Sequence, residues 1–186
     1  MNTTKKITTC ALLIALATIL MLLSKIIPSP WLQGGSVTLA SMVPIIFASI
    51  LFGTKWGLCA SLVYAIIQMI FGFYPPPTQT LLNFLLVVLL DYIVAYGVLG
   101  LSHIIYSLTG KTKFSIIFAS FTVSALRYIC HIISGILIWG VYAEEGQSVL
   151  IYSIIYNGSY MIPEIIITTV VTALIFNIKH IKKILS

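Results

Sequence analysis

Charge is scarce in this sequence: only 8% of its 186 residues are Asp, Glu, Lys or Arg, and four are acidic. The mean hydropathy of the chain is +1.11. A soluble globular domain needs a more charged surface, so the composition excludes that class. The apolar segments, about 18 to 25 residues long, are instead long enough to cross a bilayer as helices. We therefore expect an all-α membrane protein with a single domain over residues 1–186.

Motifs of catalysis and of nucleotide or metal binding are also missing. The sequence has no GxxxxGK[ST] loop, so any ATP-derived energy must come from partner proteins. It has no GxSxG elbow and no HExxH pair, which argues against the hydrolases that use them. Its cysteines, Cys10, Cys59 and Cys130, lie in apolar runs without metal-ligand spacing. We accordingly predict no catalytic residues, no metal site and no cofactor.

Apolar runs divided by turns and lysines predict six transmembrane helices. The predicted helices cover residues 7–27, 37–52, 56–73, 81–106, 115–140 and 150–176. The first run has no clear small-residue cleavage site before Pro28, so we interpret it as a helix and not as a signal peptide. Pro28 and Pro30 then end it, because proline interrupts helical hydrogen bonding.

The lysines lie at the ends of apolar runs and form no basic face, so they indicate membrane topology and not binding to nucleic acid. With six spans, eight lysines fall on one side of the membrane: Lys5, Lys6, Lys55, Lys111, Lys113, Lys179, Lys182 and Lys183. Lys25 alone falls on the other side. The excess predicts that both termini are cytoplasmic.

Polar side chains inside the apolar runs mark a functional site, because such groups are costly at membrane depth. Arg127, His131, Gly135 and Trp139 follow at steps of four, which predicts that they share one helix face with a notch at the glycine. At about 1.5 Å per residue, Asp91 reaches a depth between His131 and Arg127. A third helix carries polar residues over the same range, namely Asn157, Tyr160 and Glu164.

The charges of this interior suggest a cationic ligand. With Asp91 and Glu164 ionised and His131 neutral, Arg127 leaves the sum at −1, which one positive charge would balance. Alternatively, Arg127 pairs with one carboxylate to hold helices together while the other is protonated. Aromatic rings suited to stacking on a flat cation lie nearby: Tyr128, Trp139, Tyr152, Tyr156 and Tyr160.

Two further features have alternative interpretations. An aromatic belt at the membrane interface accounts for Tyr74 and Tyr142. Trp31, in the loop after the first span, is either an interfacial anchor or part of a mobile lid.

In the first span, Ala11 and Ala15 form a small-xxx-small pair that allows close approach of another helix.

With these residues in view, the chain resembles the thiamin-specific substrate-binding subunits, or S-components, of energy-coupling factor vitamin transporters. The resemblance covers nearly the whole chain and rests on four blocks in order: QGGSVTLASMVPI from Gln33, LLDYIVAYG from Leu89, LRYICHIISG from Leu126 and IYSIIYNGSYMIP from Ile151. Trp139 follows His131 by eight residues, which adds to the match.

The resemblance implies six helices in a bacterial cell membrane and an outward-facing pocket for thiamin, with no enzymatic activity. Asp91 and His131 would bind the aminopyrimidine edge, and Trp139 would stack on a thiamin ring. Polar contacts from Tyr92, Tyr152 and Asn157 would complete the pocket, under a lid that contains Trp31.

The partners would be a transmembrane coupling subunit, docked at Ala11 and Ala15, and two cytoplasmic ATPases. Two alternatives remain at this point. One is an S-component for another vitamin, such as riboflavin or a pyrimidine precursor. The other is an intramembrane enzyme that uses Asp91, His131 and Glu164.

Overall fold

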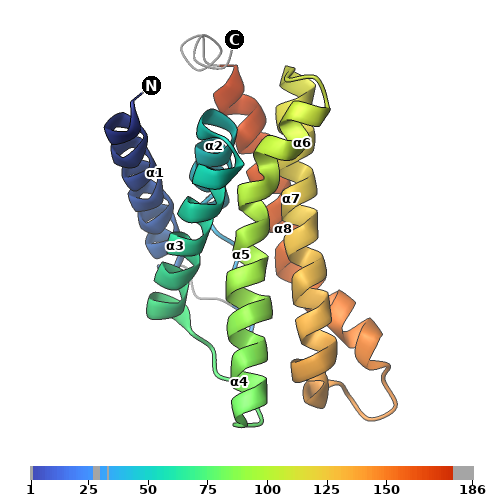
Figure 1. Cartoon of the computed structure of the whole chain (residues 1–186). Coiled ribbons are helices and arrows are strands. Elements are labelled where there is room, and N and C mark those ends of the chain that lie inside the picture. Colours follow the sequence, from blue (N-terminus) through green and yellow to red (C-terminus); the bar gives the residue numbers. More distant parts are fainter. Residues whose placement is uncertain (1, 27–29, 33, 178–186) are drawn as a thin grey trace.

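The protein is a bundle of helices, seen here in a computed structural model that describes residues 2–26, 30–32 and 34–177 (Figure 1). Five helical segments are long and apolar enough to span a membrane: Thr3–Ser24, Thr54–Gly72, Leu81–Leu108, Lys113–Tyr142 and Val149–Phe176. The first, second and last are α1, α3 and α8. A sixth apolar helix, α2, is the shorter Met42–Phe52. This arrangement confirms the predicted all-helical membrane class.

Two predicted spans differ from the structure at their ends. The first begins at Thr3 and not at residue 7, and its helix ends at Ser24; the predicted end at residue 27 lies outside the described residues. The second does not start at residue 37, because α2 begins only at Met42. Residues 37–41 cannot join the helix, since Thr38 bonds to Glu164 on α8 and Ala40 has a φ of 60°. The other four predicted spans agree with the structure within a few residues.

The two spans that carry Asp91 and His131 are helical throughout, but they change between α-, π- and 3₁₀-helix along their length. Segment 81–108 comprises α4 (Leu81–Val87), the π-helical η1 (Val88–Val94), α5 (Ala95–Gly97), the 3₁₀ turn η2 (Val98–Leu101) and α6 (Ser102–Leu108). The next segment comprises α7 (Lys113–Ser134), the π-helical η3 (Gly135–Trp139) and the 3₁₀ turn η4 (Gly140–Tyr142). π-helical turns occur often at functional sites.

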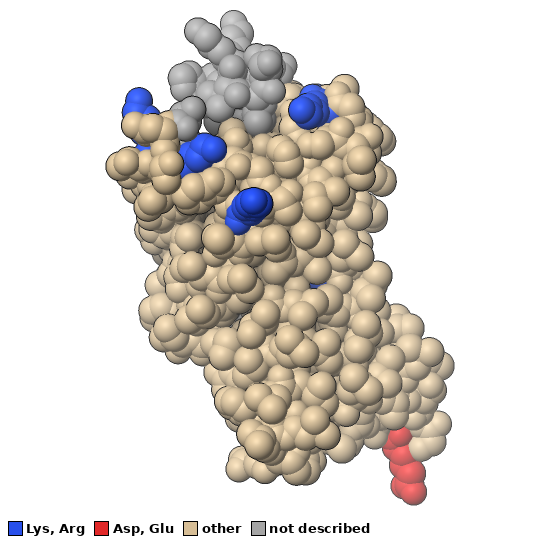
Figure 2. Space-filling model, viewed as in Figure 1, with Lys and Arg blue, Asp and Glu red and all other residues tan. Residues whose placement is uncertain are grey.

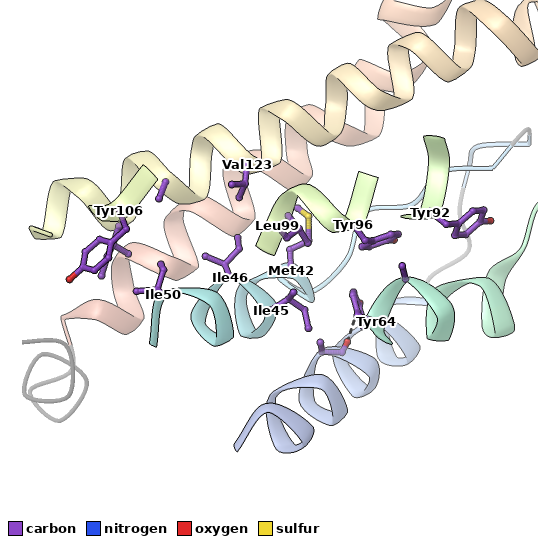
Figure 3. Packing of buried hydrophobic residues seen from close by; sticks show 14 of the residues in the cluster. Met42, Ile45, Ile46, Ile50, Tyr64, Tyr92, Tyr96, Leu99, Tyr106 and Val123 are labelled. Atoms are coloured by element: carbon purple, nitrogen blue, oxygen red, sulfur yellow. Dashed lines mark hydrogen bonds between the residues drawn. The ribbon is translucent and has the colours of Figure 1, made fainter. Parts of the chain in front are cut away.

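Helix α2 is at the centre of the bundle: every residue from Met42 to Ile50 is buried. Its side chains contact α3 and η2 in the main apolar cluster, where Met42, Ile46 and Leu99 lie close together (Figure 3). Close approach on this side depends on Gly57 and Gly100, because a Cβ at Gly100 would meet the backbone of Leu58 at 2.6 Å. The packed core therefore lies around α2.

Charge divides the molecule along its length. The start of α1 and the end of α8 lie at one end of the bundle, with the turn between α6 and α7 (Figure 1). Basic side chains gather near this end, and the acidic ones on the face shown lie at the opposite end (Figure 2). Lys5 and Lys6 belong to the start of α1, Lys55 to the start of α3, and Lys111 and Lys113 to the turn between α6 and α7, and these parts lie at the same end (Figure 1). The predicted grouping of these five lysines is therefore confirmed, whereas Lys179, Lys182 and Lys183 lie outside the described residues.

Candidate functional site

A cavity of about 560 Å³ opens beside the π-helical turns. Its wall includes the end of α1, the loop before α2, and parts of α3, η1, α7, η3 and α8. Nine of the predicted binding residues line it: Trp31, Asp91, Tyr92, Arg127, His131, Gly135, Trp139, Tyr152 and Asn157. The predicted convergence of polar groups from three helices is therefore present. The predicted block that starts at Gln33 begins outside the described residues.

The carboxylate of Asp91 is the centre of the polar wall. Nδ1 of His131 lies 3.0 Å from its Oδ1, placed to donate a hydrogen bond. Ser134 Oγ donates to Oδ2 at 2.6 Å, and Trp139 Nε1 donates to the same oxygen at 3.2 Å. Within the described part of the chain, Nε2 of His131 has no hydrogen-bond partner. A neutral His131 bonded in this way presents Nε2 as an acceptor.

The π-helical turns bring these groups together. Hydrogen bonds from i to i+5 place residues five positions apart on nearly the same side of a helix. Trp139 Nε1 accordingly donates to Ser134 Oγ, five residues earlier, at 3.1 Å. Asp91 itself lies within η1. Asp91 and Trp139 thus both lie in π-helical turns, and the contact between them depends on local winding that a regular α-helix would not give.

Gly135 lines the cavity, but its small size is needed on the side facing α8. A Cβ at this position would collide with Ser153 Oγ and lie 2.9 Å from Asn157 Nδ2. Asn157 Nδ2 donates to the carbonyl oxygens of His131, at 3.1 Å, and Ser153, at 2.9 Å. Tyr160 donates to Oδ1 of Asn157 at 2.5 Å. The glycine thus lets α8 approach and fixes Asn157 against His131.

Aromatic rings surround the rest of the cavity. Trp139 packs against Tyr74 with ring centroids 5.5 Å apart, and Tyr152 stacks on Tyr156 at 5.7 Å. The belt interpretation missed Tyr74, since this ring lines the cavity. The prediction for Tyr128 was wrong: its hydroxyl donates to the carbonyl of Ile154 and it does not line the cavity, because it lies one step round the helix from Arg127.

Arg127 makes no ion pair within the described residues, so the suggestion that it pairs with a carboxylate is not supported. Its Nη2 donates to the Tyr96 hydroxyl at 2.9 Å, and its Nη1 donates to Met42 Sδ at 3.1 Å. The guanidinium also lies 4.3 Å from the centroid of the Tyr96 ring, a cation-π geometry. Arg127 therefore joins α7 to α2 and α5 at the floor of the cavity.

Glu164 is the exception among the predicted binding residues. Its side chain is fully buried and does not line the cavity. The two carboxylate oxygens accept hydrogen bonds from the backbone N–H and the hydroxyl of Thr38, both at 2.5 Å. Because these bonds turn the carboxylate toward the loop, Glu164 lies behind the cavity wall. The arrangement also separates it from Asp91 and His131, the other two groups of the enzyme hypothesis.

The loop before α2 covers one side of the cavity and is held by α8. Trp31 Nε1 donates to Ser159 Oγ at 2.5 Å, and its ring meets the edge of Tyr160. Tyr156 donates to the Gly34 carbonyl at 2.8 Å. Gly35, with a φ of 101°, lies so close to the Tyr160 ring that a Cβ would be 2.6 Å from it. This position agrees with the lid interpretation of Trp31.

Sequence reasoning missed several lining residues, including Lys25, Gln68 and Tyr96. Gln68 and Tyr96 carried a usable signal, since each is a polar group within an apolar run. Lys25 was assigned to the membrane boundary, but its Nζ donates to the carbonyl of Phe71 at the cavity rim. Its side chain is exposed, so solvent screens its charge.

Comparisons with known proteins agree with this picture. Residues 7–184 match the family model described as "Thiamine transporter protein (Thia_YuaJ)". The thiamine transporter ThiT of Bacillus subtilis (strain 168) is 38% identical over 155 residues, which are 77% of this chain and 76% of that protein. The thiamine transporter ThiT of Lacticaseibacillus paracasei is 27% identical over 99 residues, which are 48% of this chain and 49% of that protein.

A solved structure of ThiT from Listeria monocytogenes has the same fold. The TM-score is 0.72, and the match covers 98% of this chain and 97% of that one at 19% sequence identity. The family model spans nearly the whole chain, and the described helices include five long enough to cross a membrane. The chain is therefore a multi-pass membrane protein that belongs to the thiamine transporter family.

Proposed function

We propose that this chain is the thiamin-binding S-component of an energy-coupling factor importer. The observation that carries the proposal is the hydrogen-bonded group of Asp91, His131 and Trp139 on the wall of one cavity. The cavity volume of about 560 Å³ is within the range of roughly 300 to 1,000 Å³ found for small-molecule sites. Family membership supports thiamin as the molecule bound.

The chemistry of thiamin suits this wall. Its aminopyrimidine carries an N–H donor, for which His131 Nε2 and the Asp91 carboxylate are acceptors. Its thiazolium ring is a flat cation, which aromatic faces such as Trp139 and Tyr74 attract. We assign polar contacts to Tyr92 and Tyr152, a positioning role to Asn157 and Gly135, and the lid to Trp31. Arg127 forms the floor.

Transport by this chain needs partners, and it has no enzymatic role of its own in the proposal. Its sequence has no nucleotide-binding loop, so two cytoplasmic ATPases and a transmembrane coupling subunit would supply the energy. Ala11 and Ala15 are exposed on α1 and would form the docking face for that subunit. We place the chain in a bacterial cell membrane with both termini cytoplasmic, following the distribution of lysines.

Ligand titration of the purified protein tests the proposal. We expect thiamin to quench tryptophan fluorescence without ATP, and we expect the quenching to decrease in Trp139→Phe but not in Trp56→Phe. Riboflavin and a hydroxymethylpyrimidine are titrated in parallel to examine the other vitamins. Saturable binding of riboflavin without binding of thiamin would refute the substrate assignment.

A further inference from the structure

The loop before α2 is fastened to α8 by a buried carboxylate. Glu164 is 0% exposed, and both of its oxygens accept hydrogen bonds from Thr38. The Thr38 hydroxyl also lies 2.8 Å from Ser41 Oγ and accepts from the Ser41 N–H at 3.1 Å. A buried carboxylate is costly unless it is well bonded. We call the contact between Thr38 and Glu164 the latch.

The latched segment separates two spaces. On one side is the ligand cavity, and on the other is an apolar groove of about 320 Å³ between α1, α2 and α8. Leu39 and Ile167 line both. The groove walls are otherwise Leu16, Leu20, Ala40, Val43, Pro44, Val171 and Ile175. Leu39 and Ile167 therefore form a wall that the ligand cavity and the apolar groove share.

The backbone of this wall is held in an unfavourable conformation. Ala40 has a φ of 60°, in the left-handed region that costs a non-glycine residue free energy. The N–H of the neighbouring Leu39 donates to Ser24 Oγ on α1, at 2.8 Å. Such a segment stays in place only when its surroundings fix it. The latch supplies two hydrogen bonds to Thr38, two residues before the strained Ala40.

We propose that Glu164 is a positioning residue that retains the bound ligand by holding this wall closed, and that it does not touch the ligand. The inference rests on the proposed binding of thiamin. When the latch is weakened, the wall opens more often and the ligand leaves faster, while Asp91, His131 and Trp139 remain in place. We expect the effect on dissociation and not on association, because the incoming ligand still meets Asp91, His131 and Trp139 in the same positions.

The test is stopped-flow measurement of thiamin association and dissociation with the purified full chain. Thr38→Val removes the hydroxyl but keeps the backbone N–H bond to Glu164, so it is the milder variant. Glu164→Gln replaces one acceptor oxygen with an amide N–H2 donor and leaves the other as a neutral acceptor, so one of the two bonds from Thr38 is lost. We expect each to raise the dissociation rate about tenfold, the scale of one hydrogen bond. We expect association rates within about twofold of wild type.

Two comparisons separate the latch from a general loss of stability and from direct contact with the ligand. Thr172→Val is the matched control, because Thr172 makes a buried hydrogen bond to Ser120 between α8 and α7 at 3.2 Å, away from the cavity. It should lower thermal stability without faster dissociation. In the double variant of Thr38 and Glu164, we expect the two effects on dissociation to overlap and not to multiply.

The outcomes are distinct. Failure of wild type to bind thiamin would refute the proposed function and not the geometry of the latch. With wild-type binding intact, unchanged dissociation in Thr38→Val would overturn the latch. Equal acceleration in Thr172→Val would show a general loss of stability, and multiplied effects in the double variant would show that Thr38 contacts the ligand directly.

Discussion

Asp91 has an organising role because three side chains converge on one carboxylate. His131, Ser134 and Trp139 all contact it, and each lies on the wall of the cavity or next to it. The carboxylate thereby fixes the tautomer of His131, since an acceptor at Nδ1 keeps the proton on that nitrogen. It also orients the indole ring of Trp139. One acidic side chain thus sets the direction of a base and an aromatic face together.

Asp91→Asn is expected to weaken thiamin binding by about 1 to 3 kcal/mol, the cost of losing charge-assisted hydrogen bonds in a buried site. The amide replaces one acceptor oxygen with a donor that faces Ser134 and Trp139. Isothermal titration measures the change. Asn83→Ala is the control, because the Asn83 amide bonds to the Thr78 carbonyl and does not line the cavity. Equal affinities of Asp91→Asn and wild type would move the site elsewhere.

At the scale of elements, the site depends on irregular helices packed closely against a regular one. The π-helical η1 and η3 carry Asp91 and Trp139, and α8 supplies Asn157 against them. Gly135 sets the distance between η3 and α8. An extra methyl group at that point must separate the two elements or displace Ser153 and Asn157, so packing and binding are coupled there.

Gly135→Ala is therefore expected to lower the free energy of unfolding by about 1 to 3 kcal/mol and to weaken thiamin binding as well. Thermal unfolding in detergent and ligand titration measure the two effects. Gly97→Ala is the matched control, since Gly97 is also helical and has nothing within 4 Å of its Cβ position. That variant should equal or slightly exceed wild type in stability, because alanine favours helix.

The helices and most of the site were predictable from the sequence. Long apolar runs define helices without reference to the rest of the fold, and polar residues within them most often mark a site. The start of α2 and the position of Glu164 were not predictable. Both follow from the bond between Thr38 and Glu164, which are 126 residues apart. The prediction for Tyr128 was wrong because Tyr128 follows Arg127 by one residue, and one step along a helix turns the side chain away from the cavity.

At the scale of the whole molecule, most described lysines and the two exposed glutamates lie at opposite ends of the long axis of the helix bundle. Apart from Lys25 at the cavity rim, the described lysines belong to elements whose ends lie with the start of α1, and the loop that contains Glu144 and Glu145 lies at the far end (Figures 1 and 2). The long helices between these ends are apolar on their exposed faces. We therefore propose, from the positive-inside rule, that the basic end is cytoplasmic. The cavity, next to η3 and the loop after α1, lies toward the acidic end.

Cysteine labelling tests this orientation in intact cells. In a variant whose natural cysteines, Cys10, Cys59 and Cys130, are replaced by alanine, we expect Glu145→Cys to react with a membrane-impermeant thiol reagent. Lys111→Cys should react only after the membrane is permeabilised. The reverse pattern would invert the proposed topology.

The short α2 also accounts for the room that a ligand needs. A helix needs about 20 residues to cross the hydrocarbon core, and the 11 residues of α2 leave roughly two and a half turns unbuilt. A non-helical stretch of chain takes the place of those turns and lines the cavity. The vitamin would thus occupy the space that the missing turns of α2 leave among the helices. A change in the short non-helical stretch would alter the shape of that space, while the tightly packed half of the bundle stays the same.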